Sequence, residues 1–379
     1  MNNKTKRYLK FKFQKYYQNA KISFPPDYTS REWGFIPFDL LPQIVMKRHK
    51  SFYSKKDVAD FLHAEVPAHV YHSVAYYKDP GAPKMNEKHW LKADLIFDLD
   101  ADHLPNARDS YVDMLNHVKK ESIKLLDFLQ NDFGFLEKEI KIIFSGGRGY
   151  HFHITNEEIL TVGSHGRREI IDYISAIGLD TEIIFNKKEF ISEKHSSTNF
   201  GWEGKINKHI KSYLYDISKK KDAIKHLMEF DGIGKKKAQY ILDAVRQNKI
   251  DEWQMLSKIN PSFKTIINKY INDKKVDVYK ANVDEPVTTD IKRLIRLPGS
   301  LHGKTGMCVK TIPLKMFENF DPLNDAIVFG NETVELKVMK PFKEYMKNRL
   351  FEYEEGVYKL PEYIAIYLMC KGIAEYGNE

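Results

Sequence analysis

The sequence is poor in cysteine and has no long apolar run. Its two cysteines, Cys308 and Cys370, are too few for a disulfide framework or a cysteine-rich zinc site, and they suit a reducing compartment. No stretch of about 18 consecutive apolar residues is present, so no membrane-spanning segment is expected. The N-terminus also lacks the apolar core of a signal peptide. These absences favour a cytoplasmic protein.

What the sequence does contain is ample apolar material and an uneven distribution of positive charge. Its 379 residues are 42% hydrophobic and 13% aromatic, enough for one large domain and a smaller one. The net charge is +8, but residues 205–275 alone hold 17 Lys and Arg against 8 Asp and Glu. A regional excess of this kind favours a surface that binds a polyanion. A solvated, lysine-rich helical face is the alternative.

A predicted buried strand carries two acids that such a strand would not normally tolerate. Alternation along the strand places Leu95, Phe97 and Leu99 on one face, and Asp98 and Asp100 on the other. Carboxylates this close repel each other, and their burial is costly unless they bind a cation. We therefore predict a divalent-metal site at these two acids. A strand running into a turn, or an exposed strand face, would explain the pattern without metal.

A glycine-rich turn follows, between strands predicted at residues 140–144 and 150–154. Its sequence, Ser145-Gly-Gly-Arg-Gly149, frees backbone N–H groups to approach a phosphate, and Arg148 adds a forked cation. His151, on the strand after the turn, could donate to the same phosphate. The alternatives are an ordinary hairpin with surface histidines, or a His-x-His metal site formed with His153.

A third informative stretch lies near residue 300, where cations surround a Pro-Gly bend. The cations are Arg293, Arg296, His302 and Lys304. Such a cluster again suits phosphate. Upstream, Asp284 and Asp290 each offer a further carboxylate for a metal pair.

Together these stretches resemble a known family. Phe97–Asp100, Ser145–His151 and Arg296–Gly306, in this order and spacing and with Arg31–Phe35 before them, are similar to the catalytic small subunit of archaeal and eukaryotic DNA primases. The resemblance covers most of residues 25–345.

The resemblance implies a role for each matching residue. Asp98, Asp100 and Asp284 would hold two Mg²⁺ or Mn²⁺ ions, because the family's third acid stands twelve residues before the position of Arg296. Asp290 is the reserve for the third acid. The residues implied to contact the nucleotide are Glu32, Ser145, Arg148, His151, Arg293, Arg296 and His302.

The implied activity is template-directed nucleotidyl transfer that starts RNA primers on single-stranded DNA for replication, with DNA primers as the alternative product. The implied partners are the template, nucleoside triphosphates and a primase large subunit in a heterodimer, and the implied setting is the cytoplasm of an archaeal cell, associated with DNA. One rival is a repair or plasmid polymerase of the same superfamily that only extends primers. The other is a non-catalytic nucleic-acid-binding protein.

The sequence departs from the family in one region. Members usually carry a cysteine-rich zinc knuckle soon after the acidic strand, whereas residues 103–135 contain no cysteine. We therefore predict no structural zinc, and a helix in that space.

A short motif within the basic region has its own resemblance. Residues 230–242 resemble a helix-hairpin-helix, in which a Gly-Ile-Gly hairpin, Gly232 to Gly234, points backbone N–H groups at a nucleic-acid phosphate. The lysines that follow, Lys235, Lys236 and Lys237, would add charge. A simple helical turn that serves packing is the alternative.

The expected fold is α/β of the α+β kind, a mixed-sheet catalytic core with an inserted all-helical subdomain. The core would comprise residues 1–204 and 276–345, the helical insertion 205–275, and a helical tail 346–379. Helices are predicted within residues 1–22, 57–63, 109–135, 167–177 and 340–374. Further strands are predicted at 68–77, 288–297 and 307–312.

Overall fold

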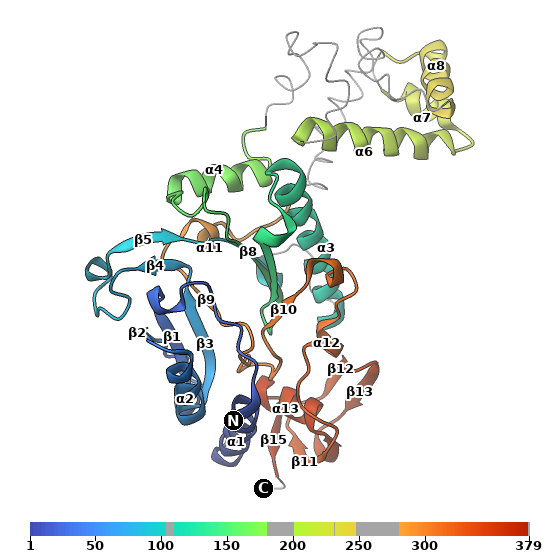
Figure 1. Cartoon of the computed structure of the whole chain (residues 1–379). Coiled ribbons are helices and arrows are strands. Elements are labelled where there is room, and N and C mark those ends of the chain that lie inside the picture. The colour runs from blue at the N-terminus through green and yellow to red at the C-terminus, as the bar shows by residue number, and fades with distance from the viewer. Residues whose placement is uncertain (104–109, 180–200, 231, 248–279, 378–379) are drawn as a thin grey trace. The chain divides into compact units, whose positions relative to one another are not determined.

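The structure is a computed structural model of the chain, and it describes residues 1–103, 110–179, 201–230, 232–247 and 280–377. The chain divides into two compact units (Figure 1). The first unit comprises Met1–Ile123, Phe135–Ile171 and Asn282–Glu379, and the second comprises Lys124–Gly134 and Asp172–Ala281.

The first unit mixes helices with antiparallel strands. Its helices are α1 (Asn3–Asn19), α2 (Lys55–Glu65), α11 (Glu285–Thr289), α12 (Pro322–Asp325) and α13 (Glu362–Lys371), and α3 (Tyr111–Asp127) and α4 (Ser164–Ile174) begin in it. Its strands are β1 (Trp33–Pro37), β2 (Lys47–Lys50), β3 (Pro67–Ser73), β4 (Ala75–Tyr77), β5 (Trp90–Ala93), β6 (Leu95–Asp100), β7 (Ile140–Phe144), β8 (Gly149–Ile154), β9 (Leu294–Arg296), β10 (Lys310–Ile312), β11 (Thr333–Val338), β12 (Phe342–Met346), β13 (Arg349–Tyr353), β14 (Gly356–Pro361) and β15 (Ala374–Tyr376). This irregular order confirms the predicted α+β class.

Two four-stranded sheets carry the predicted site, with strand orders β2-β1-β3-β9 and β10-β7-β8-β6. They are linked where β3 bends into β4 and β5 leads into β6. There the Asp94 N–H donates to the Val74 carbonyl, at 3.0 Å, and the Val74 N–H donates to the Arg293 carbonyl, at 2.8 Å. These bonds bring the acidic strand β6 and the segment before β9 to the same part of the unit.

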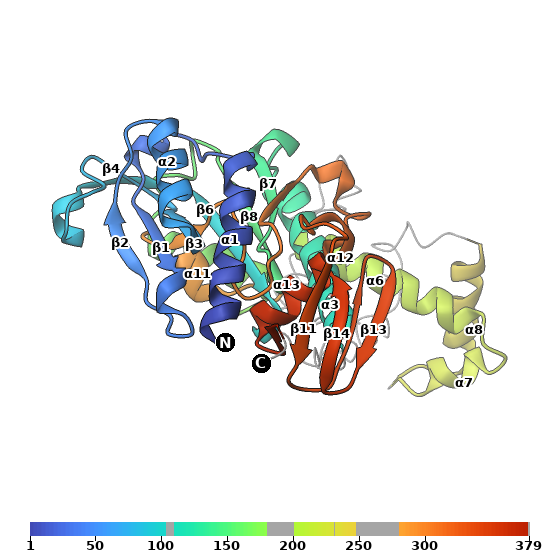
Figure 2. The ribbon, with the colours of Figure 1, turned by 90° about the horizontal axis from the view of Figure 1, so that it is seen from below.

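The N-terminal helix α1 confirms the helix predicted within residues 1–22. Its buried side chains, Leu9, Phe13 and Tyr17, are spaced four residues apart and form one apolar stripe. The helix packs against α2, α13 and β15 (Figure 2). The Asn2 side chain donates to the Glu375 carboxylate at 2.9 Å, so the two ends of the chain are joined.

The predicted helical character of residues 340–374 is wrong for most of that range. Strands β12, β13 and β14 occupy residues 342–361, and the range ends in a single helix, α13. Burial alternates along β11 and β12, which is the period of a strand with one buried face. Helix α13 is buried along nearly its whole length, so it has no polar stripe from which its boundaries could be recognised.

The strand predicted at residues 288–297 is also shorter than expected. Residues 285–289 form helix α11, which has Pro286 in its first turn, and only Leu294–Arg296 form strand β9. The apolar residues that suggested one long strand are therefore divided among a helix, a turn and a short strand. Strand β10 likewise begins at Lys310, three residues after the predicted start at Met307.

The second unit is helical in its described residues. Its complete helices are α6 (Gly201–Ser218), α7 (Ala223–Met228) and α8 (Lys235–Arg246). Their buried apolar side chains form one core, which includes Leu214, Leu227, Ile233, Ile241 and Val245. The boundary predicted at residue 205 falls inside α6, and residues 248–279 of the predicted insertion lie outside the described residues. Within the described part of the chain, no helix has the length and apolar character that crossing a membrane requires.

Candidate active site

Strands β6 and β8 place the first predicted acid beside the predicted histidine. Asp98 stands opposite His151 in the antiparallel ladder, and Asp100 stands opposite Gly149. Residues directly opposite share a face, so the His151 Nε2 atom lies 3.4 Å from Asp98 Oδ1. The other face of β6 is filled by apolar side chains that are fully buried. The strand thus carries its two acids on one face, as predicted.

Asp284 joins these two acids from the residue that precedes α11. Its backbone N–H donates to the Asp98 carbonyl at 2.9 Å. The pKa of the Asp98 carboxyl is raised to about 7, first by burial and then by the charges of Asp100 and Asp284. Arg293 and Arg296 oppose this rise. The chain therefore gathers negative charge at Asp98 and faces it with cations.

Asp290, the reserve for the third acid, makes local hydrogen bonds in the structure. Its carboxylate accepts the Lys292 N–H at 2.9 Å, and its carbonyl accepts the Arg293 N–H at 3.2 Å. These bonds close the turn that leads into β9. Its charge is not among those that act on the pKa of Asp98.

The glycine-rich turn and the loop around residue 302 touch each other. The Ser145 hydroxyl accepts the N–H groups of Gly147 and Gly149, both at 3.3 Å, which holds the turn closed. The Thr305 hydroxyl donates to the Gly146 carbonyl. Two of the sequence motifs are therefore parts of one structure.

Gly146 shows why this contact requires glycine. Its φ of +76° is one that side chains rarely adopt, and a Cβ atom there would lie 2.7 Å from the Cβ of His302. The His302 ring also lies against the His69 ring, with centroids 4.8 Å apart. Burial lowers the pKa of His302 well below its usual value, so the ring is neutral and offers a single N–H.

Two of the three predicted arginines of the site, Arg148 and Arg296, differ in their partners. Arg296 contacts the His69 Nδ1 atom at 2.7 Å and lies over the Tyr71 ring. Arg148 forms a fork with the carboxylate of Asp102, and its Nε lies 3.6 Å from Asp100. The sequence analysis predicted no role for Asp102, although it follows Asp98 and Asp100 at the next alternate position. It holds Arg148 beside the acids of β6.

The donor set fits a divalent cation that is also held by a substrate. Mg²⁺ binds through a few carboxylates and completes its coordination with phosphate oxygens. Asp98, Asp100 and Asp284 provide such carboxylates, and a cation bound beside them would offset the burial and the repulsion that raise the pKa of Asp98. Among the described residues, no three His, Cys, Asp or Glu side chains form a group that could hold a metal by themselves.

Comparison with known proteins places this chain in a family. Residues 97–313 match the family model described as DNA primase small subunit, a range that contains the three acids and both phosphate-binding candidates. The chain belongs to the DNA primase small subunit family. The DNA primase small subunit PriS of Methanococcoides burtonii is 53% identical over 393 residues, which span all of both chains. That of Methanosarcina acetivorans is 45% identical, covering 100% of this chain and 98% of the relative, and that of Halobacterium salinarum is 37% identical over all of both.

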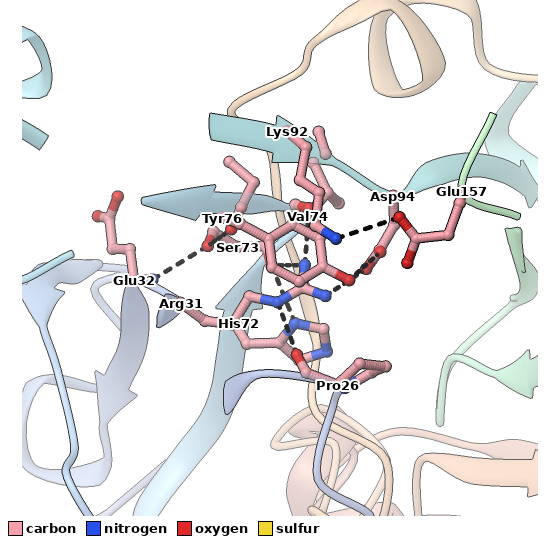
Figure 3. A network of polar contacts seen from close by, with 12 residues as sticks. Pro26, Arg31, Glu32, His72, Ser73, Val74, Tyr76, Lys92, Asp94 and Glu157 are labelled. Carbon is pink, nitrogen blue, oxygen red and sulfur yellow. Dashed lines mark hydrogen bonds and ion pairs between the residues drawn. The ribbon is translucent and has the colours of Figure 1, made fainter. Parts of the chain in front are cut away.

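Glu32, which the resemblance to primases places near the nucleotide, is a fully buried residue in a basic environment. Its carboxylate accepts from Arg48 Nε at 2.9 Å and from the His49 N–H at 3.1 Å. The buried Lys88 ammonium lies 3.8 Å away. Figure 3 shows this carboxylate pointing away from the polar network around Arg31. Glu32 thus holds Arg48 and Lys88 in place in this primase subunit.

The Arg31 network was not foreseen from the sequence, and it supports the entry to β6. The Arg31 guanidinium is fully buried, forms an ion pair with Asp94 at 2.8 Å and donates to the Ser73 and Val74 carbonyls (Figure 3). The Arg31 Cζ atom lies 3.5 Å from the centroid of the Tyr76 ring. These contacts tie β1 and the β3–β4 bend to the residue that starts β6.

The second unit contains a turn at the predicted Gly-Ile-Gly hairpin; its binding of DNA stays a prediction. Gly232 has a φ of +77°, and Gly234 is the residue that caps the N-terminus of α8. Lys235, Lys236 and Lys237 form the exposed first turn of α8, and the Lys237 ammonium donates to the Gly232 carbonyl at 3.0 Å. Residue 231, between the two helices, lies outside the described residues.

Proposed function

We propose that this chain is the catalytic subunit of a primase, and that it starts RNA primers on single-stranded DNA by two-metal nucleotidyl transfer. The observation that carries the proposal is the raised pKa of Asp98, which burial and two neighbouring acids, Asp100 and Asp284, produce on a strand face next to cationic loops. A site of this kind favours divalent cations and binds phosphate beside them. DNA primers are the alternative product.

The acids would serve as ligands for two Mg²⁺ or Mn²⁺ ions. Asp98 and Asp100 project from one strand face, and Asp284 approaches from α11, so the carboxylates come from two directions. When bound, the two ions supply activation of the 3′-hydroxyl nucleophile and stabilise the leaving pyrophosphate. The prediction that the chain holds no structural zinc stays a prediction.

The loops would bind and orient the triphosphate. Ser145 fixes the shape of the glycine turn by accepting the N–H groups of Gly147 and Gly149, and neutral His151 and His302 can each donate one N–H. Arg148 would exchange Asp102 for phosphate oxygens, while Arg293 and Arg296 add positive charge opposite Asp98. Groups fixed in this way stabilise the charge that develops during transfer without having to reorganise. Glu32 would act by holding Arg48 near the nucleotide.

The template would be bound by the basic second unit, with the hairpin of Gly232, Gly234 and the lysines of α8 on its phosphates. Contacts of this type are independent of base sequence and weaken as the salt concentration rises. The family name, small subunit, supports a large-subunit partner in a heterodimer. The proposed setting remains the cytoplasm of an archaeal cell.

The test is dinucleotide synthesis on unprimed poly-pyrimidine DNA with labelled nucleoside triphosphates and Mn²⁺. Asp98→Asn and Asp100→Asn should each abolish the product while the protein stays folded, with a cooperative thermal transition no lower than that of the wild type. Asp60→Asn, on the exposed face of α2, is the matched control and should be as active as the wild type. Synthesis retained in both variants would overturn the metal assignment.

The same assay separates the proposal from its two rivals. A polymerase that only extends primers would be active on a template with an annealed primer and inactive without one. A non-catalytic binding protein would bind DNA in a salt-sensitive way and give no product with either template.

A further inference from the structure

Lys371, the last residue of α13, lies beside the predicted nucleotide site although it belongs to none of the sequence motifs. Its ammonium nitrogen is 4.9 Å from the centroid of the Tyr111 ring and 5.4 Å from that of Tyr367. The Tyr111 hydroxyl in turn donates to the Gly147 carbonyl in the glycine-rich turn. One aromatic side chain therefore contacts both the ammonium and the turn.

Helix α13 is also held against the loop that contains His302. Gly306 has a φ of +71°, and a Cβ atom there would lie 2.7 Å from Ile366 Cγ2 and 3.8 Å from Cys370 Sγ. The helix and the loop are thus in contact next to Lys371. Packing therefore fixes the end of α13, while Lys371 itself is exposed and its ammonium can be reached by a ligand.

The charges around Lys371 are mostly of its own sign. Burial lowers its pKa, Arg148 and Lys304 lower it further, and Glu344 opposes them. Within the described part of the chain, no carboxylate lies at ion-pair distance from the Lys371 ammonium. Among the described residues, Arg148 is paired with Asp102, whereas Lys371 and Lys304 have no carboxylate at ion-pair distance, and their positive charge favours the binding of an anion.

We propose that Lys371 is a further phosphate-binding residue of the nucleotide site, and that its ammonium binds the triphosphate of the incoming nucleotide. The inference rests on the proposed function, because it assigns a new contact within the same site. A DNA phosphate has the same chemistry as a ligand. The triphosphate is favoured because the glycine turn, which Lys371 adjoins through Tyr111, ends at Gly149 opposite Asp100 of β6, and the His302 loop contacts that turn.

The experiment compares Lys371→Met and Lys371→Arg with a control lysine in the same region. Lys343→Met is that control, because Lys343 is an exposed residue of β12 that pairs with Glu352. For each full-length protein, kcat and KM for the nucleotide are measured in dinucleotide synthesis. Binding of the Mn²⁺–nucleotide complex is followed by calorimetry, and binding of single-stranded DNA by fluorescence anisotropy.

Lys371→Met should raise KM and the calorimetric Kd for the nucleotide about tenfold, the loss expected for one charge-assisted hydrogen bond. The turnover number and DNA affinity should change less than about twofold, and Lys371→Arg should restore most of the nucleotide affinity. An unchanged nucleotide Kd in Lys371→Met overturns the inference, as does a loss confined to DNA binding. If the wild type makes no product, the proposed function fails, while the calorimetric comparison still decides the role of Lys371.

Discussion

The backbone N–H of Asp284 donates a hydrogen bond to the backbone carbonyl of Asp98, with the two atoms 2.9 Å apart. This bond joins the residue before α11 to the middle of β6, so the two acids are held together by main chain rather than by mobile side chains. The repulsion between their carboxylates is thereby built into the fold. Burial is the main cause of the raised pKa of Asp98, and repulsion from Asp100 and then Asp284 adds to it.

The first prediction concerns the pH dependence of stability without divalent cations. The pKa of Asp98 is about 7 in the folded protein and about 3.9 when unfolded, so the folded state holds the extra proton between these values. Stability therefore falls as the pH rises from about 4 to 7, by at most about 4 kcal/mol at about 1.4 kcal/mol per unit. Asp98→Asn lacks this ionisation and should be more stable than the wild type at pH 8.

Thermal unfolding in the presence of EDTA measures this effect. The gap in transition temperature between Asp98→Asn and the wild type should shrink as the pH falls to about 4. Asp60→Asn serves again as the control and should follow the wild type at every pH. A gap that is independent of pH would contradict the assignment of the effect to Asp98.

The second prediction concerns Gly146. Gly146→Ala adds a Cβ atom 2.7 Å from that of His302 and forces an L residue to a φ of +76°, so we expect a loss of about 2–4 kcal/mol in unfolding free energy. Nucleotide affinity should fall as well, because the turn and the His302 loop would separate. Urea denaturation and nucleotide titration measure the two effects.

Two control variants separate the effect of the positive φ from that of the contact with His302. Gly134→Ala meets only the unfavourable φ, +72°, with no atom within 4 Å, and should cost about 1 kcal/mol. Gly163→Ala meets neither obstacle and should be neutral or slightly stabilising. Equal losses for Gly146→Ala and Gly134→Ala would show that the contact with His302 contributes nothing.

The third prediction concerns the buried ion pair of Arg31 and Asp94. Asp94→Ala leaves a fully buried guanidinium without its counter-ion and should reduce the unfolding free energy by about 3–5 kcal/mol. Lys92→Met breaks the neighbouring exposed pair with Glu157 and should change it by less than about 1 kcal/mol. Urea denaturation distinguishes the two, and comparable losses would mean that burial is not what makes the Arg31 pair important.

The sequence allowed the strand faces and turns of the candidate site to be predicted because these features are local. Alternation along β6 decides where Asp98 and Asp100 point, and clustered glycines after β7 indicate a turn. The adjacency of Asp284 could not be derived from local pattern. It came from the family resemblance, since it depends on how α11 meets β6.

Other features escaped prediction because their causes are tertiary. The fork between Arg148 and Asp102 requires the β6 end and the glycine turn to meet, and the position of Lys371 depends on the packing of α13. The strands β12–β14 were misjudged as helix because their alternation is mixed with exposed apolar residues such as Leu350 and Val357. Local propensity is a weak guide where packing decides.

The most direct test of the three-acid site compares Asp284→Asn with Asp290→Asn in primer synthesis on unprimed single-stranded DNA. We predict that Asp284→Asn reduces the turnover number by at least about a thousandfold, and that Asp290→Asn keeps most of the wild-type rate. Full activity in Asp284→Asn, or loss only in Asp290→Asn, would contradict the account.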